Sequence, residues 1–197
     1  MRQVVLASRN AKKLAELQEL LRPLGLHLRT VAEFADEAAE EPAPSFVENA
    51  LLKARHAARV SGLPALADDS GIEVDALNGA PGVRSARFAG PHASDSDNND
   101  RLLQELREVP DGARGARYVC VLAFLRHPHD PIPLIAEGQW RGRILREPRG
   151  RNGFGYDPLF RVEAHGKSAA ELDPALKNRL SHRARAAAAL LARLREG

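Results

Sequence analysis

The sequence predicts a single α/β domain that spans residues 1–197. The chain opens with an apolar run, a helical repeat and an alternating run, which is the order of a β-α-β unit. Further runs of strand length alternate with amphipathic helical segments along the rest of the chain. Of the 197 residues, 44% are hydrophobic, which is enough apolar material for one packed core.

The composition excludes several classes of protein. Lysine and arginine total 29 against 26 acidic residues, and this net charge of +3 is only a weak argument for binding nucleic acid. The single cysteine, Cys120, forbids an intramolecular disulfide and lies in an apolar run, which indicates a buried, inert thiol in a reducing compartment. No apolar stretch has the length of a signal peptide or membrane span, so we expect a cytoplasmic protein without membrane contact.

The first β-α-β unit covers residues 3–31. A short apolar strand at 3–7 is followed by a helix at 12–21, in which leucines recur at helical spacing. Pro23 and Gly25 end this helix, and an alternating strand follows at 26–31. The acidic, proline-bearing residues 34–44 are expected to form a loop.

A long helix and a carboxylate pair come next. Ser45 and Glu48 form a capping-box pattern that begins a helix reaching Ser61, and Lys53 lies within it. Residues 63–77 are interpreted as a strand, a polar turn at 68–71 and a second strand, closed by the Gly-Pro turn at 79–82. The pattern therefore places two adjacent aspartates at a turn.

The second half of the chain repeats the alternation of helix and strand. Residues 97–109 predict an amphipathic helix, 116–126 the strongest strand, and 132–145 its hairpin partner. The glycine-rich residues 147–158 are expected to form a loop. A short and a longer helix follow, with Asp173 and Ser181 as candidate N-caps.

The polar residues 8–13, SRNAKK, connect the first strand to the first helix. Such a junction offers unpaired backbone N–H groups and a positive helix end, to which Lys12 and Lys13 add charge, and this combination suits phosphate. The glycine spacing of a Walker loop is absent. Taken alone, the segment fits a capped helix with solvated lysines better.

Two groups of carboxylates are candidate magnesium ligands: Asp68 with Asp69, and Glu40 with Glu41 in the acidic loop. In nucleotide enzymes, Mg²⁺ is typically held by one or two carboxylates together with substrate phosphates and water. The alternative is an Asx-type turn and a solvated acidic surface.

The loop around Phe154 and Tyr156 combines glycines with aromatic rings, which suits stacking on a nucleobase, and Asp157 follows as a cap or ribose contact. The alternative is a tight turn whose aromatic rings fill the core. His182 and Arg183 are candidate donors to a base edge, although such residues at a helix start are more often surface groups.

The order of these motifs resembles the inosine triphosphate pyrophosphatase family over nearly the whole chain. The motifs that carry the resemblance are SRNAKK, SFVENALLKA, LADDSGIEVDALNGAPGVRSARFAG, GFGYDPLF and SHR. The resemblance implies hydrolysis of ITP, dITP and XTP to the monophosphate and pyrophosphate with Mg²⁺, usually by a homodimer. It also implies an α/β fold with a long twisted mixed β-sheet flanked by helices, and two lobes with a central active cleft.

The resemblance also implies roles for individual residues. The triphosphate would be bound by the first loop, namely Ser8, Arg9, Asn10, Ala11, Lys12 and Lys13. Asp69 would be the catalytic carboxylate and a metal ligand, with Lys53 as a catalytic cation, Asp68 in support, Ser70 on the substrate and Glu41 or Glu40 as the second metal carboxylate. The base pocket would comprise Phe154, Gly155, Tyr156, Asp157, Lys177, His182 and Arg183. Donors there would suit a 6-keto oxygen and leave the 6-amino group of adenine unpaired.

One position departs from the family pattern, since the family commonly has Thr-Gly-Asn where this chain has Ser8-Arg9-Asn10. A side chain at a position that needs positive φ would be strained, so Arg9 is expected either to strain the loop or to add a phosphate contact.

Two other functions compete with this interpretation. The septum-formation-inhibitor-like pyrophosphatases share the architecture and favour pyrimidine or modified nucleotides, but SHR and GFGYDP argue against them. A noncatalytic nucleic-acid or nucleotide-binding module would explain the basic balance, but it has no need of acidic metal ligands, which repel phosphate without a cation. We therefore expect no stable nucleic-acid complex.

Overall fold

The computed structural model describes residues 2–37 and 39–196, and within them the predicted β-α-β unit is confirmed. Strand β1 (Arg2–Leu6) leads into helix α1 (Ala11–Leu21) and then into strand β2 (Leu26–Thr30), and the two strands are parallel. Gly25 ends the helical segment with a φ of 62°, a left-handed conformation that glycine adopts without steric cost.

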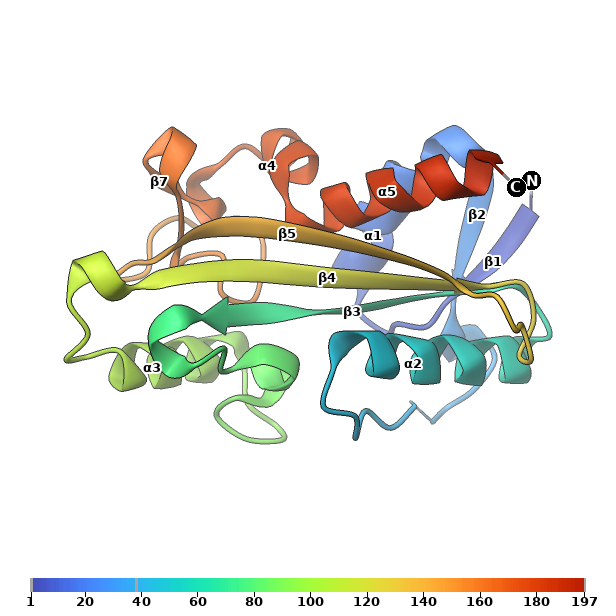
Figure 1. Cartoon of the computed structure of the whole chain (residues 1–197), viewed down its shortest axis with the longest axis horizontal. Helices are drawn as coiled ribbons and strands as arrows, with labels where there is room; N and C mark the ends of the chain where they lie inside the picture. Colours follow the sequence, from blue (N-terminus) through green and yellow to red (C-terminus); the bar gives the residue numbers. More distant parts are fainter. Residues whose placement is uncertain (1, 38, 197) are drawn as a thin grey trace. The chain divides into compact units, whose positions relative to one another are not determined.

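The described strands form one open, mixed sheet with the order β2-β1-β3-β4-β5-β6-β7 (Figure 1). Strand β1 pairs in parallel with β2 and β3, whereas β6 pairs antiparallel with both β5 and β7. The remaining strands are β3 (Ala65–Val74), β4 (Gly115–Leu125), β5 (Leu134–Ile144), β6 (Phe160–Val162) and β7 (Lys167–Ser168). The α/β class and the mixed sheet flanked by helices are confirmed.

By contacts, the chain forms two compact units. The first comprises residues up to 69, 120–138 and from 182 onward, and the second comprises 70–119 and 139–181. Strands β3, β4 and β5 each contribute residues to both units.

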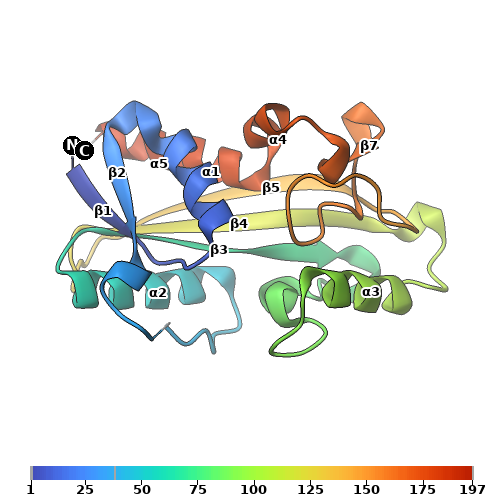
Figure 2. The same cartoon turned by 180° about the vertical axis from the view of Figure 1, so that it is seen from behind.

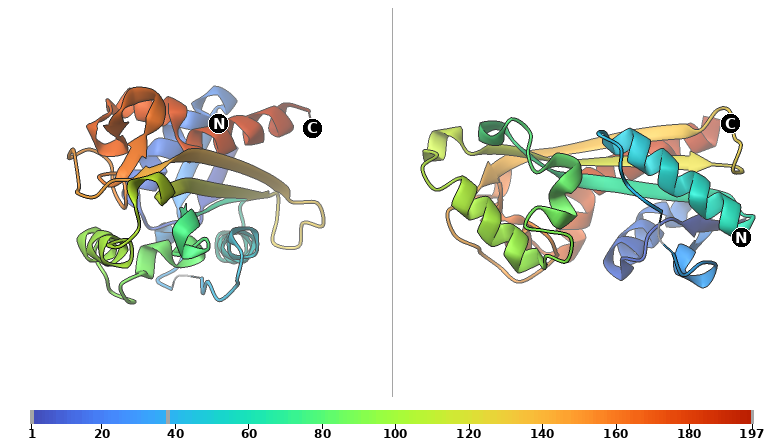
Figure 3. Two further views of the ribbon diagram at one scale, coloured as in Figure 1. Left: turned by 60° about the vertical axis from the view of Figure 1, so that its left-hand side comes forward. Right: turned by 90° about the horizontal axis from the view of Figure 1, so that it is seen from below.

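In the first unit, helix α2 (Phe46–Ser61) covers one face of the sheet, and α1 and α5 (His182–Glu196) cover the other (Figure 1 and Figure 2). The right panel of Figure 3 shows α2 from its outer side, lying over the strands. Its alanines at positions 50, 54, 57 and 58 are fully buried, so this helix face approaches the sheet closely. Leu6, Leu17, Leu66 and Leu122 belong to the core of this unit.

The second unit is built around an aromatic cluster. The rings of Tyr118, Trp140 and Phe160 lie 4.7 to 6.5 Å apart between centroids, which is the range of favourable aromatic pairs. Helix α3 (Asp95–Glu105) and helix α4 (Pro174–Leu180) flank the sheet residues of this unit on opposite sides (Figure 1).

The turn predicted at 68–71 is wrong. Residues 65–74 form the single continuous strand β3, and Asp68 and Asp69 lie in its middle with 1% and 6% of their surface exposed. Consecutive polar residues usually signal a turn because burying them is costly. Here buried cations from other elements neutralise both carboxylates, so the strand continues.

Two of the predicted helix caps are confirmed. Ser45 caps α2 and its hydroxyl donates to the Glu48 carboxylate at 2.5 Å, and Asp173 caps α4 by accepting from two backbone N–H groups. Ser181, expected as an N-cap, ends α4 and directly precedes α5. No helix among residues 2–37 and 39–196 combines the length and hydrophobicity that a bilayer crossing requires.

Candidate active site

Asp68 is the centre of a buried ion-pair network. Its carboxylate accepts from Lys13 Nζ at 2.5 Å and from Arg183 Nε at 2.8 Å, and the Cys120 thiol donates to Oδ2 at 3.3 Å. Burial alone would raise the pKa of Asp68, but the charges of Arg183 and Lys13 outweigh it and hold the pKa well below the usual range. Asp68 is therefore an ionised anchor that joins α1 and α5 to β3.

Asp69, the next residue on β3, belongs to a second cluster with Lys53 and Glu41. The Lys53 ammonium lies 2.6 Å from Asp69 Oδ1, 2.9 Å from Glu41 Oε1 and 2.9 Å from the backbone oxygen of Asp68. An ammonium has three N–H donors, and these three acceptors match them. Adjacent strand residues point to opposite faces of a sheet, which explains why the two aspartates have separate partners.

The electrostatics of this second cluster favour a proton acceptor. Burial raises the pKa of Asp69 above its ordinary value, and the neighbouring Lys53 offsets this only in part. For Lys53, burial disfavours the charged form, but the Asp69 and Glu41 carboxylates outweigh it and raise the pKa. The Oδ2 atom of Asp69 is buried and has no hydrogen-bond partner among the described residues. A buried carboxylate oxygen without a partner is costly and is typical of a functional atom.

The loop between β1 and α1 presents its polar groups beside this cluster. Asn10 caps α1 by accepting from the backbone N–H groups of Lys12 and Lys13, and its own N–H donates to Ser8 Oγ. The capped-helix interpretation is therefore correct for Asn10, whereas the Lys13 ammonium is paired with Asp68 instead of solvated. Ala11 and Lys12 lie exposed in the first turn of α1.

Arg9 does not strain this loop. Among the described residues other than glycine, only Asn78 has a positive φ, so the glycine-like conformation considered for Arg9 is not found. The guanidinium donates instead to the backbone oxygen of Ala35 at 2.8 Å. This bond holds an exposed cation at the mouth of a pocket.

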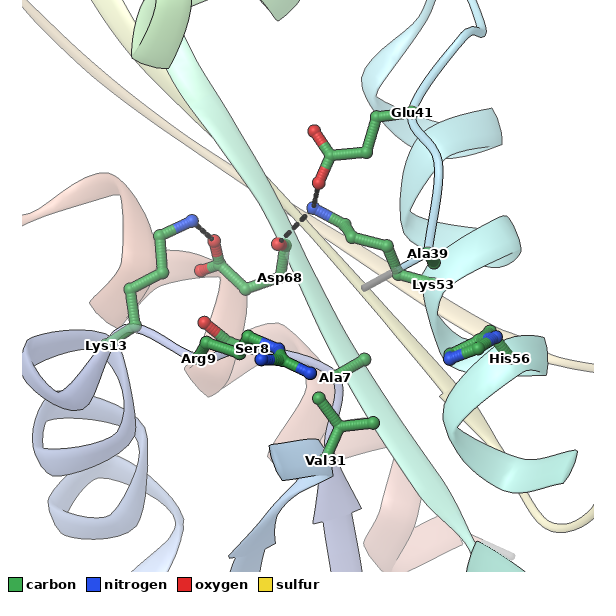
Figure 4. A pocket seen from close by; sticks show the side chains of 10 residues that line it. All are labelled: Ala7, Ser8, Arg9, Lys13, Val31, Ala39, Glu41, Lys53, His56 and Asp68. Carbon is green, nitrogen blue, oxygen red and sulfur yellow. Dashed lines mark hydrogen bonds and ion pairs between the residues drawn. The ribbon is translucent and has the colours of Figure 1, made fainter. Parts of the chain in front are cut away.

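The pocket has a volume of about 170 Å³ and lies entirely within the first unit (Figure 4). Its polar lining consists of Ser8, Arg9, Lys13, Glu41, Lys53, His56 and Asp68. Three cations and two carboxylates meet there. Glu41 belongs to the pocket, whereas Glu40 is exposed and does not line it, so the geometry distinguishes the two candidate glutamates.

Sequence reasoning missed two polar residues of the first unit. His56 lies one helical turn after Lys53 on the same face of α2, and its ring points into the pocket, with Nε2 buried and no partner among the described residues (Figure 4). Glu16 on α1 accepts from Arg183 Nη1 at 2.6 Å. The spacing from Lys53 could have indicated His56, but no local signal links Glu16 to a residue 167 positions away.

Arg183 and His182 begin helix α5. Arg183 has 1% of its surface exposed, and its guanidinium is held between Asp68 and Glu16. His182 is 6% exposed. Their role as base-edge donors stays a prediction, but Arg183 first of all neutralises the buried Asp68.

The glycine-rich loop of the second unit is organised by Asp157. Its Oδ2 accepts from the backbone N–H of Phe154 at 2.9 Å and from Lys177 Nζ at 2.6 Å, and its Oδ1 accepts from the Tyr118 hydroxyl at 3.3 Å. A Cβ at Gly153 would lie 2.0 Å from the same carboxylate, so glycine is required there. Asp157 is a buried cap of the loop, which is one of the two roles expected for it.

The two aromatic rings of this loop differ. Tyr156 is 4% exposed, packs in the aromatic core and donates to the Ser85 backbone oxygen at 2.8 Å. The Tyr156 ring is therefore buried in the core and does not present the face for stacking on a nucleobase that the sequence predicted. Phe154 is half-buried, and the Lys177 ammonium lies 4.9 Å from its ring centroid.

A magnesium ion fits the carboxylates of the first unit only as a site shared with a substrate. Among the described residues, no group of three or more His, Cys, Asp and Glu side chains could hold a metal ion. Asp69 with its unpartnered Oδ2, together with Glu41, supplies the one or two carboxylates that Mg²⁺ commonly uses when phosphates and water complete its shell. Ser70, half-buried on β3, does not line this pocket.

Comparisons with known proteins agree on one family. A family model described as the Ham1 family matches residues 4–193. The chain is 58% identical over 192 residues to a Pseudomonas aeruginosa protein named dITP/XTP pyrophosphatase, covering 98% of this chain and 96% of that one. It is 53% identical to an Escherichia coli O157:H7 protein of the same name over the whole length of both. A solved Ham1 structure from Coxiella burnetii superposes with a TM-score of 0.92 at 51% identity and covers 100% of both chains.

Proposed function

This chain belongs to the Ham1 family, and we propose that it hydrolyses the nonstandard purine triphosphates ITP, dITP and XTP to the nucleoside monophosphate and pyrophosphate. Such an enzyme removes these nucleotides from the pool. The observation that carries the proposal is the Asp69–Lys53–Glu41 cluster, with its unpartnered carboxylate oxygen, next to a pocket lined by three cations. We also propose that residues 1–197 form one catalytic domain.

We propose that the pocket of the first unit binds the triphosphate. The cations Arg9, Lys13 and Lys53 offset the negative charge of the phosphates, and the Ser8 hydroxyl offers a hydrogen bond. The N-terminal turn of α1 adds a positive helix end, with Ala11 and Lys12 in that turn. Asn10 contributes by fixing the cap of this helix.

Asp69 acts as the general base in the proposed reaction. A water oxygen forms a bond to the α-phosphorus, its proton passes to Asp69, and the bond between the α-phosphorus and the bridging oxygen breaks, so that pyrophosphate leaves. The raised pKa of Asp69 brings the carboxylate closer to the working pH, which strengthens it as a base. Lys53 fixes Oδ1 of this carboxylate and leaves Oδ2 for the reacting water.

We propose that Asp69 and Glu41 hold Mg²⁺ when the nucleotide is bound. The ion would neutralise charge that develops on the phosphate oxygens. In the structure Lys53 bridges the two carboxylates and offsets their mutual repulsion.

We propose that the base is recognised by Phe154 and by donors from Lys177, His182 and Arg183. The Phe154 ring offers a stacking face, and the backbone groups of Gly155 and Asp157 fix the loop that carries it. Donors that meet a 6-keto oxygen accept hypoxanthine and xanthine and disfavour adenine, because the adenine amino group would meet a donor. Tyr156 supports this loop from the core and Ser70 is proposed to contact the substrate.

We also propose a cytoplasmic homodimer that forms no stable complex with nucleic acid. The family resemblance supports the homodimer. The small net charge of +3 supports the absence of a stable complex with nucleic acid. Light scattering coupled to size exclusion distinguishes dimer from monomer. A salt-sensitive gel shift on undamaged DNA would instead favour the binding-module alternative.

The decisive experiment measures phosphate release from ITP, dITP, XTP, GTP and ATP with Mg²⁺, each with and without added inorganic pyrophosphatase. We expect phosphate only when the auxiliary enzyme is present, and far more from ITP, dITP and XTP than from ATP and GTP. Phosphate without the auxiliary enzyme would contradict cleavage at the α-phosphorus. A preference for pyrimidine triphosphates would favour the septum-formation-inhibitor-like alternative.

A further inference from the structure

The backbone of Gly155, the residue after Phe154, is held by side chains from another element of the second unit. Asp95 Oδ2 on helix α3 accepts from the backbone N–H of Gly155 at 2.8 Å. Asn99, four residues later on the same helix, donates from Nδ2 to the backbone oxygen of Gly155 at 3.0 Å. Residues four apart lie on one face of a helix, so α3 holds Gly155 from both of its peptide groups.

The third bond comes from within the loop. The backbone N–H of Phe154 donates to Asp157 Oδ2 at 2.9 Å. The N–H groups of Phe154 and Gly155 and the carbonyl of Gly155 are thus all paired with side chains. These groups determine the path of the main chain at Phe154 and hence the direction in which its side chain leaves.

We call the three bonds from Asp95, Asn99 and Asp157 the clamp of this loop. The clamp matters because the loop needs an unusual backbone conformation. Gly153 and Gly155 have φ values of 78° and 61°, in the left-handed region. Glycine reaches this region easily but also leaves it easily, since its backbone is conformationally free. Three side-chain bonds to consecutive backbone groups oppose that freedom, and Asn99 is further fixed by donating to the Asp95 backbone oxygen at 2.8 Å.

We propose that Asp95 and Asn99 are positioning residues for recognition of the nucleobase, which they serve by fixing the Phe154 ring before substrate arrives. This inference rests on the proposed function, in which Phe154 stacks on the base. Neither residue touches substrate in the proposal. A preorganised ring avoids the entropy cost of ordering a loop on binding.

The test compares Asp95→Ala and Asn99→Leu with Asp97→Ala. Asp97 lies in the same first turn of α3 and caps the helix through Ser94, but it makes no bond to the loop in the structure. Asp97→Ala therefore controls for weakening of the helix itself. Asp95→Asn keeps an oxygen that accepts from Gly155 and is the conservative rescue variant.

We expect Asp95→Ala and Asn99→Leu to raise KM for ITP by roughly three- to tenfold, the range for losing one hydrogen bond, with kcat changed less than twofold. Their affinity for IMP falls by a similar factor, whereas their affinity for pyrophosphate does not change. Asp95→Asn restores most of the wild-type KM, and Asp97→Ala leaves KM unchanged. Equal losses for IMP and pyrophosphate, or equal effects of Asp95→Ala and Asp97→Ala, would overturn the proposal.

A second measurement separates the clamp from the proposed function. Hydrogen exchange of the nucleotide-free protein over residues 150–158 should be faster in Asp95→Ala and Asn99→Leu than in the wild type and Asp97→Ala. If exchange rises but the wild type hydrolyses no purine triphosphate, the clamp is real and the function is wrong. If exchange does not rise, the clamp does not hold the loop, and the positioning role is refuted whatever the activity.

Discussion

At the scale of single residues, Asp69 and Asp68 show how neighbouring aspartates on one strand acquire different chemistry. Asp68 is surrounded by Lys13 and Arg183, and its pKa falls well below the usual range. Asp69 has the single cation Lys53 within hydrogen-bond distance, and burial raises its pKa. The first carboxylate is thereby fixed as an anion, and the second is left as a proton acceptor.

Asp69→Asn tests this division of roles. The amide keeps the shape of the side chain but is not a base, so we expect kcat for ITP to fall by about 100- to 10,000-fold. Nucleotide binding, measured by calorimetry, should persist because the cations of the pocket remain. The exposed Asp36→Asn is the control and should keep wild-type activity. Near wild-type turnover in Asp69→Asn would refute the assignment.

Arg9 provides a second test at this scale, because its guanidinium lines the pocket and donates to the backbone oxygen of Ala35. Arg9→Gly removes one of the three cations of the pocket. We expect KM for ITP to rise about tenfold, the effect of losing a charge-assisted hydrogen bond of about 1.4 kcal/mol, while affinity for inosine stays unchanged. If Arg9→Gly binds triphosphate as tightly as the wild type, Arg9 makes no phosphate contact.

The candidate site could be predicted only in part from these residues. The carboxylates could be recognised as candidate metal ligands, but the roles of Asp69 and Lys53 came from the family resemblance, and the choice between Glu40 and Glu41 stayed open. The turn at 68–71 was predicted wrongly because the pattern of polar residues does not reveal that Lys13 and Arg183 compensate the buried charge. The pairing of Arg183 with Glu16 depends on tertiary structure and leaves no local trace.

At the scale of elements, periodicity and capping predicted α1, α2, β4 and β5 almost to their ends, since their signals are local. Helix α3 begins at Asp95, two residues before the predicted start at Asp97. Asp95 and Ser96 are polar and add nothing to the apolar repeat that marks a helix, and the pattern did not identify Ser94 as the cap. Strands β6 and β7 have 3 and 2 residues and were not predicted at all. So short a strand carries no detectable alternation.

The turn between β4 and β5 supports a pH-dependent prediction. Asp130 has 1% of its side chain exposed and accepts from the backbone N–H groups of Arg126 and Ile132 and from the Arg126 guanidinium. Hydrogen bonding to Arg126 lowers the pKa of Asp130 below that of the unfolded chain. A depressed folded-state pKa stabilises the protein above the unfolded-state value of about 3.9, and the contribution is lost as the pH falls through the folded-state value.

Asp130→Asn should therefore lower the free energy of unfolding by about 1–3 kcal/mol at pH 7. The difference from the wild type should shrink progressively below about pH 4. Urea unfolding at pH 7 and pH 3 measures both values. Asp111→Asn removes an ion pair whose carboxylate is 77% exposed and should change stability by less than about 0.5 kcal/mol at either pH. A pH-independent loss in Asp130→Asn would show that the charge plays no part.

At the scale of the whole molecule, the sequence predicted the α/β class but not the order of the strands. Neighbours such as β1 and β3 are separated along the chain by α1, β2, a long loop and α2, and their pairing depends on burying apolar surface from distant segments. The family resemblance implied two lobes, but the sequence does not show where the two compact units divide, because β3, β4 and β5 contribute residues to both without any break in composition.

These shared strands predict that the chain unfolds in one cooperative step. Strands β3, β4 and β5 each contribute residues to both units. If these strands lose their pairing in one unit, the continuations of the same strands in the other unit lose support, and we expect that unit to unfold as well. Trp140 is the only tryptophan of the chain and lies 3% exposed in the second unit, so its fluorescence follows that unit alone. Far-UV circular dichroism follows the helices of both units. We expect the two thermal transitions to agree within about 2 °C, the shift that a difference of about 1 kcal/mol causes in a chain of this size. A tryptophan transition clearly separated from the circular dichroism transition would mean that the two units unfold independently.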